Sequence, residues 1–365
     1  MSDILSPEIT FALSMLVRST LIVLAAWLIV TAMMALRADA RARHLAWLLA
    51  FTALAALPVL SLALPPVVIP LPHALASFAS PDLSSLGEHV RGGAGFALWV
   101  WGGYALGAAA MLARLMLARL ALAELWHRAE ARDVPADLSA LAALAGVKGP
   151  IALRCAADSI APMTWANRIL LPAEAMEWPQ QQLRDALLHE LSHIARRDSL
   201  TQFLAAIVRA LIWFSPAVWF ALRALRLEQE RACDERVVAA GAAPAAYAQT
   251  LFDVATSLQT PALGMGVSTA MVHRCDLERR LLAVLSPVQS QPLATHHIAL
   301  FGVAALASLT LISSARLRDQ ALILAPLGSL PAATPMSAAL STPLQPLATP
   351  LRMPDPPRET PAPHN

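Results

Sequence analysis

Two histidines and a glutamate at short spacing are the residues of this chain best suited to chemistry. They lie in His189-Glu190-Leu191-Ser192-His193, an H-E-x-x-H pattern within a stretch of helical periodicity. Residues four apart share one face of a helix, so both imidazoles can reach the same metal ion. Glu190 points to the side, where it can hold a metal-bound water as general base. The pattern predicts a zinc peptidase in which His189 and His193 bind the metal and Glu190 is catalytic.

A third protein ligand is expected, because catalytic zinc takes three and leaves one position open. The best candidate is Glu230, on a second predicted helix downstream. Asp234 follows four residues later on the same face, where it can accept the free N–H of a ligand histidine and fix its ring. Glu228 lies about 200° around the helix from Glu230 and cannot share that face. We predict one zinc ion per chain, bound by His189, His193 and Glu230.

The remaining metal-binding side chains are weaker candidates. Cys233 lies off the face of Glu230, so a buried thiol is the favoured interpretation over a soft ligand. Asp198 can brace the end of the active-site helix or form an ordinary helix-end ion pair. His273 has no partner at a useful spacing, and His296 and His297 precede an apolar run, where interfacial positions suit them. A solvated, charged surface stays open as the alternative interpretation of the Glu230 helix.

The composition indicates a membrane protein. Of the 365 residues, 57% are hydrophobic and 14% are charged, whereas soluble domains have about 45–50% and about 25%. The net charge of +2 is too small to indicate a nucleic-acid partner. Three cysteines without C-x-x-C spacing predict no disulfide framework and fit a reduced, intracellular compartment.

Four apolar runs are predicted to span the membrane, each close to the ~20 residues that a bilayer requires. They are residues 19–36, 45–64, 95–113 and 298–314. The basic connection 37–44 follows the first run, and Arg114, Arg119 and Arg128 follow the third. The positive-inside rule therefore places residues 115–297 in the cytoplasm and both termini outside. The first residues lack the basic segment of a cleavable signal peptide, so we expect a retained anchor.

The predicted soluble domain, residues 115–297, is the only segment long enough for one. Short strands are expected at 151–154 and 169–171, and a helix from Pro179 to about Arg197 carries the H-E-x-x-H pattern.

Two further segments complete the predicted organisation. The run 202–222 is apolar, but a single crossing there would separate Glu230 from the two histidines. Because Arg209 and Pro216 interrupt it, we predict a helical hairpin that packs in the domain or at the membrane interface. The proline-rich residues 315–365 are expected to be a disordered tail outside the membrane.

Three stretches together resemble the BlaR/MecR-type antirepressor metallopeptidases, which are membrane-embedded gluzincins: residues 187–198, 213–219 and 230–235. Residues 162–165 and 169–172 resemble the edge-strand region beside the family's active site, and Ala166 stands where members often have glycine. The resemblance covers roughly residues 5–315. It implies a mainly α membrane protein with four transmembrane helices and a cytoplasmic zincin-like α+β domain between the third and fourth. It also implies zinc bound by His189, His193 and Glu230, with Glu190 as base.

The resemblance further implies a location and partners. The location is the bacterial cytoplasmic membrane, and the substrate is a cytoplasmic protein such as a winged-helix repressor. Membrane lipid is a partner and nucleic acid is not, while a homo-oligomer and self-cleavage before the fourth span stay open. Sensors of this family carry an external penicillin-binding domain. About 50 residues follow the fourth run here, without an S-x-x-K motif, so we expect a member that lacks this domain.

Two alternative functions stay open. A membrane quality-control peptidase would share both H-E-x-x-H and the E-x-x-x-D of Glu230 and Asp234. A non-catalytic signalling or scaffold protein would use the same ligands for a structural zinc. An intramembrane protease is disfavoured, because Arg184, Asp185 and Arg196 make the motif helix too polar for the bilayer.

Overall fold

The computed structural model is mainly helical and describes seven stretches of the chain. These are residues 7–63, 67–70, 94–132, 137–157, 161–257, 267–286 and 295–318. All of them belong to one compact unit that ends at Arg318. The predicted disordered tail therefore lies outside the described residues, except at its start. There the prediction was wrong, because Ala315–Arg318 forms strand β6, whose partner in a parallel pair is β1, Val67–Pro70.

Three helices among the described residues are long and apolar enough to cross a membrane. The candidate spans are Phe11–Ala35 in α1 (Pro7–Ala35), Ala40–Ser61 in α2 (Ala40–Ala63) and Gly95–Arg128 in α5 (Ala94–Arg128). They correspond to the first three predicted spans. The fourth predicted span falls in α12, Thr295–Ser314, where only Phe301–Thr310 forms a shorter apolar stretch. It remains a prediction.

Helix α5 continues past the predicted end of the third span at residue 113. It runs without interruption to Arg128, and the segment after the span contains no glycine or proline and is rich in alanine and leucine. Such residues favour helix, so nothing local ends it. Large apolar side chains stand out from its first half, where Trp99 is 82% exposed and Leu98 is 74% exposed. Lipid is the solvent that suits this surface.

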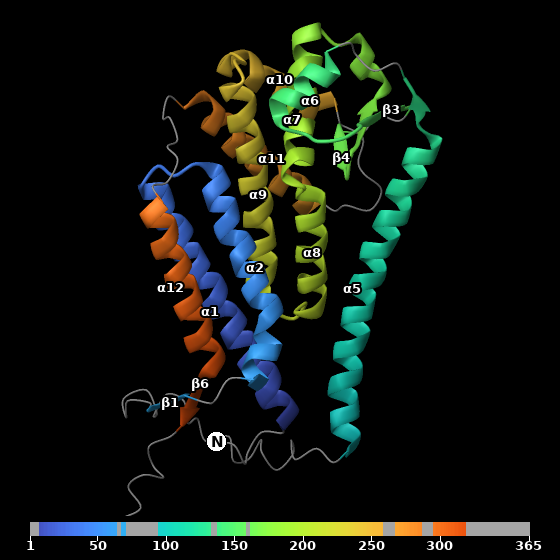
Figure 1. Cartoon of the computed structure of the whole chain (residues 1–365). Helices are drawn as coiled ribbons and strands as arrows, with labels where there is room; N and C mark the ends of the chain where they lie inside the picture. Colours follow the sequence, from blue (N-terminus) through green and yellow to red (C-terminus); the bar gives the residue numbers. More distant parts are fainter. Residues whose placement is uncertain are drawn as a thin grey trace, which may run out of the picture. The chain divides into compact units, whose positions relative to one another are not determined.

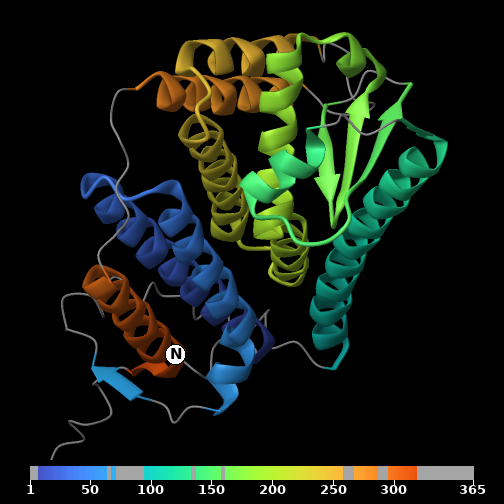
Figure 2. The same ribbon diagram turned by 45° about the horizontal axis from the view of Figure 1, so that its top comes forward.

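A small mixed sheet and two helices form the core of the part of the chain that follows α5. Its strand order is β2-β3-β5-β4, with β3 and β5 parallel and the outer pairs antiparallel. The strands are β2 Glu130–Ala131, β3 Ala152–Ala156, β4 Met163–Trp165 and β5 Arg168–Pro172. The strands lie between α5 and α7, Gln180–Arg196 (Figure 2). Strand β4 is thus at one edge of the sheet, as the resemblance implied.

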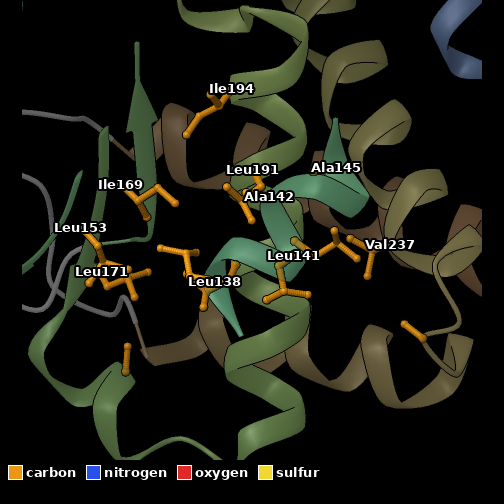
Figure 3. Close-up of a cluster of buried hydrophobic side chains, with 14 of the residues drawn as sticks. Leu138, Leu141, Ala142, Ala145, Leu153, Ile169, Leu171, Leu191, Ile194 and Val237 are labelled. Atoms are coloured by element: carbon orange, nitrogen blue, oxygen red, sulfur yellow. The ribbon is translucent and has the colours of Figure 1, made fainter. Parts of the chain in front are cut away.

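Leucine and isoleucine side chains fill the space between this sheet and α6, Leu138–Ala145, and α7 (Figure 3). Ile169 and Leu171 of β5 are fully buried there, as is Leu191 of α7. The short 3-10 helix η1, Ala173–Glu177, leads from β5 towards α7. This core packs against the apolar face of α7. It therefore fixes which face of the motif helix turns inward.

The predicted hairpin at 202–222 corresponds to α8, Asp198–Leu211, a turn, and the first part of α9, Pro216–Ala239. Pro216 occupies the first turn of α9, where its missing N–H costs nothing. The hairpin packs against α1 and α2: Val218 and Leu225 are fully buried in one cluster with Trp47 and Leu54. Because α9 continues beyond residue 222, the same helix carries Glu230.

The connection between α1 and α2 is tied to α9 by charged groups. The guanidinium of Arg43 lies 2.7 Å from the buried Glu228 carboxylate, and the N–H of Ala40 donates to Glu235 Oε2 at 3.0 Å. Two more helices, α10 Pro244–Ser257 and α11 Val267–Leu285, follow α9 and pack against it and against α7 (Figure 1). These helices complete the surroundings of the motif.

Candidate metal centre

The motif helix α7 begins directly after Pro179 and ends at Arg196. Arg197 adopts a left-handed conformation with φ of 56°, which stops α7 and turns the chain into α8. The prediction that Pro179 lies in the first turn was off by one residue, since it immediately precedes the helix. Glu190 and His189 are on the buried face, at 7% and 8% exposure.

The structure brings His189, His193 and Glu230 together. His189 Nε2 lies 3.4 Å from Glu230 Oε2, and His193 Nε2 lies 3.6 Å from Glu230 Oε1. All three ligand atoms are within 4.8 Å of one another. Zinc bonds of about 2.0–2.1 Å in a tetrahedral site put ligand atoms about 3.3 Å apart. Two imidazole nitrogens and one carboxylate at these separations fit a zinc ion, with a fourth position left to other groups.

His193 is supported from the junction of α7 and α8. Its Nδ1 lies 2.9 Å from Asp198 Oδ2, and Arg196 Nε lies 3.4 Å from Asp198 Oδ1. Asp198 therefore makes the helix-end ion pair and also holds a ligand histidine, a role that the sequence interpretation missed. Cys233 is fully buried with its sulfur 3.4 Å from His193 Nδ1. It contacts the opposite side of the ring from Glu230.

His189 is supported from α9 and α10. Asp234 Oδ1 lies 3.3 Å from His189 Nδ1, close to the position predicted for it. Tyr247 was not predicted: its hydroxyl lies 2.9 Å from the same nitrogen and donates to Asp234 Oδ1 at 2.7 Å. Tyr247 is fully buried. Thirteen residues separate it from Asp234, a spacing that carries no recognisable signal in a sequence.

Arg280 of α11 is a second residue that sequence reasoning missed. Its guanidinium donates to both oxygens of Asp234, at 2.9 and 2.8 Å, and lies 3.0 Å from Glu230 Oε2. Burial opposes ionisation of these carboxylates, but Arg280 outweighs it and lowers the pKa of Asp234 to about 2. The pKa of Glu230 also falls well below its usual range for the same reasons. Glu230 is thus held as the anion that a metal ligand must be.

The carboxylates favour a positive charge between them. Burial opposes the charged form of His189, but hydrogen bonds to Asp234 and Glu230 overcome it and raise its pKa to about 10. The carboxylates therefore stabilise a positive charge at this point of the molecule, whether it is carried by a proton or by a metal ion. Arg280 limits the negative charge that must be neutralised, because it already pairs with both carboxylates.

Glu190 lies on the wall of a cavity of about 360 Å³, which His193 and Glu230 also line. Burial raises the pKa of Glu190, although charges on His193 and His189 oppose the rise. A carboxylate with a raised pKa is a stronger base, which suits the role of a general base. The far walls come from α5, α8 and β4, including Arg119, Phe203 and Trp165. The cavity is large enough for part of a peptide.

The other candidate residues lie elsewhere. Glu228 pairs with Arg43 and Arg231, away from the metal ligands, as the helix geometry predicted. The side chains of His273, His296 and His297 lie outside the described part of the chain.

Two comparisons with known proteins bear on this geometry. The family model described as BlaR1 peptidase M56 matches residues 10–284. Regulatory protein BlaR1 of Bacillus licheniformis is 31% identical over 70 residues, which are 19% of this chain and 12% of that relative. The matched stretch therefore spans a small part of the relative's length. The family match, in contrast, includes every residue of the metal centre and of its supports.

Proposed function

The chain belongs to the BlaR1 peptidase M56 family, and from this premise we propose a zinc-dependent membrane endopeptidase that cleaves a cytoplasmic protein in signal transduction. One observation carries the proposal. His189, His193 and Glu230 converge at the separations of a zinc site, and Glu190 stands beside them on a cavity wall. A structural zinc needs no such cavity and no buried base next to it.

The chain's own residues supply binding and proton transfer. His189, His193 and Glu230 would hold the metal, which when bound supplies Lewis acidity at the scissile carbonyl. The Glu190 carboxylate accepts the proton of the attacking water and then donates it to the leaving amide nitrogen. The raised pKa of Glu190 favours the first step, since a stronger base takes the proton of the water more readily.

The edge strand β4 suits an extended substrate. Its residues Met163, Thr164 and Trp165 line the cavity, and β4 ends the sheet on that side. An extended peptide can bind such an edge through main-chain hydrogen bonds. We therefore propose that the substrate presents an exposed, extended segment, as a linker between two domains does.

The substrate proposed is a transcriptional repressor, and its cleavage would relieve repression. The relative's printed name, a regulatory protein, supports a regulatory substrate. We also propose the four-span arrangement, with α12 as the last span and the peptidase part in the cytoplasm. The basic residues of the 37–44 connection and of the second half of α5 support this orientation.

Replacing Glu190 tests the activity. We expect Glu190→Gln to lower cleavage about 10²–10⁴-fold, the usual contribution of a general base, while zinc stays near one per chain. Mass spectrometry of cells with wild type and Glu190→Gln would reveal the cytoplasmic proteins that accumulate. The exposed Glu177→Gln is the matched control. If Glu190→Gln cleaved the substrate as fast as wild type, Glu190 would not be the general base. If the purified wild type contained no zinc, the proposed zinc site would be wrong.

Labelling tests the orientation. A cysteine introduced at exposed Glu177 should react with a membrane-impermeant maleimide only after cells are opened. One introduced at Ser2 should react in intact spheroplasts. Cys155 and Cys233 are buried and should stay silent, and Cys275 is replaced by serine. Reaction of the Glu177→Cys variant in intact cells would reverse the proposed topology.

A further inference from the structure

A second, larger cavity lies away from the metal centre, between α1, α2 and α12. Its volume is about 630 Å³, within the range of about 300–1,000 Å³ that is typical of small-molecule sites. The three helices lie side by side (Figure 1). Apolar side chains form most of its wall, among them Ile22, Ile29, Leu45, Leu49, Phe301 and Leu309. Hydrocarbon is the chemistry that these walls accept.

One end of the cavity is cationic. Arg41, His44 and Arg196 line it together with a single acid, Asp39. Asp39 is already engaged, because its Oδ1 accepts the N–H of Ala42 at 3.1 Å at the start of α2. Arg41 makes no ion pair within the described stretches of the chain and is exposed. Arg196 pairs with Asp198, which does not line the cavity, so Arg41 is the guanidinium at this end without an ion pair among the described residues.

Two nitrogens at this end lack an acceptor. His44 is only 6% exposed, yet its Nε2 has no hydrogen-bond partner among the described residues, and neither does Arg196 Nη2. Buried donors are nearly always paired, so each such nitrogen calls for an explanation. An anionic headgroup at this end of the cavity would supply the missing acceptors. The cationic end and the apolar wall together specify a molecule with an anionic head and a hydrocarbon tail.

We propose that this cavity binds one anionic phospholipid, with its phosphate at Arg41, His44 and Arg196 and one acyl chain along α1 and α12. The orientation rests on the proposed topology, which places the start of α2 at the cytoplasmic surface, where anionic headgroups lie. Arg196 also contacts Asp198, the carboxylate that holds His193. The headgroup would thus lie two contacts from a metal ligand.

Native mass spectrometry of the full chain in detergent tests the proposal. Palmitoyl-oleoyl phosphatidylglycerol should bind at one copy per chain and at least about tenfold more tightly than the zwitterionic phosphatidylcholine of the same chains, since charge-assisted hydrogen bonds distinguish them. Arg41→Gln should weaken phosphatidylglycerol binding about tenfold. Arg37→Gln, an exposed arginine of the same connection that does not line the cavity, should not.

A second variant keeps the test decisive if the arginine change disturbs folding. A Cβ atom added at Gly302, which lines the cavity, would meet no atom within 4 Å. Gly302→Leu should therefore extend into the open space of the acyl-chain region and displace the lipid. Gly103→Leu on α5, equally open, is the control and should keep it.

Three results would overturn the proposal. The first is equal binding of the two lipids, and the second is wild-type binding by both Arg41→Gln and Gly302→Leu. The third is displacement of the lipid by millimolar inorganic phosphate alone, which would mean that the site recognises a free anion. Loss of Glu190-dependent cleavage leaves lipid binding untouched, so failure of the proposed activity and failure of this site are distinguishable.

Discussion

The two histidines of the proposed metal centre are held in different ways. His193 donates its Nδ1–H to the carboxylate of Asp198, five residues further along the chain. His189 depends on Asp234, Tyr247 and Arg280, which come from three later helices. The support of His193 forms where α7 turns into α8. The support of His189 forms only when α9, α10 and α11 have packed together. The stability of the metal centre is therefore partly local and partly a property of the whole peptidase part.

The largest effect should come from the distant support. Arg280→Met leaves Asp234 and Glu230 as buried carboxylates without their cation. Removing one partner of a buried ion pair costs about 3–5 kcal/mol, so the metal-free protein should unfold far more easily in denaturant. The exposed neighbour Arg279→Met is the control and should change stability little. Equal losses in the two variants would mean that the distant support is no more than surface charge.

The local support should affect zinc more than folding. Asp198→Asn keeps the size of the side chain but weakens the acceptor for His193 Nδ1. Loss of such an outer hydrogen bond typically lowers metal affinity about 10–100-fold. Competition with a chromophoric chelator measures this, and Asp137→Asn at an exposed position serves as control. If Asp198→Asn destabilised the metal-free protein as much as Arg280→Met, the two supports would not differ in their effect on folding, and the comparison would be wrong.

A smaller effect is expected from Tyr247→Phe. Asp234 Oδ1 already lies 3.3 Å from His189 Nδ1 and can take over the hydrogen bond when the hydroxyl is gone. Zinc affinity should therefore fall by less than about tenfold, below the loss in Asp198→Asn. Tyr104→Phe, which changes the other of the two tyrosines, should leave zinc binding unchanged. A larger loss in Tyr247→Phe than in Asp198→Asn would make the hydroxyl, and not Asp234, the main support of His189.

The smallest effect, on stability alone, is expected at Ala166, which belongs to neither support. Ala166 joins β4 to β5 with φ of 50°, a conformation that costs a residue with a side chain about 1–2 kcal/mol. Glycine avoids that cost but loses more freedom on folding. Ala166→Gly should therefore stabilise the protein by up to about 1 kcal/mol in denaturant unfolding. Zinc affinity should not change. Ala161→Gly, where φ is not positive, should be destabilising instead.

The same contrast explains what could be predicted from the sequence. His189, His193 and Glu190 follow from helix periodicity, and Glu230 with Asp234 from a second helix of fixed spacing. Tyr247 and Arg280 could not be found, because their positions depend on how helices pack and on no spacing along the chain.

The fold shows the same limit. The first three apolar runs predicted three helices of sufficient length, and short strands were expected where β3 and β5 lie. The strand Ala315–Arg318 was missed, because pairing with Val67–Pro70 joins segments that are far apart in sequence. The left-handed conformation of Ala166 was equally hidden, since alanine rarely adopts it; only the resemblance, through its usual glycine, marked the position.

The place of Arg280 in the chain has a consequence for when the proposed metal centre can form. Translation delivers the motif helix and Asp198 first, Glu230 and Asp234 later, and Arg280 last of all. Until α11 emerges from the ribosome, the carboxylates around His189 lack their counter-ion and the centre is incomplete. The growing chain therefore contains the H-E-x-x-H residues well before Arg280 has been synthesised and the site can be completed. Biogenesis itself therefore delays the moment at which the proposed metal centre is complete.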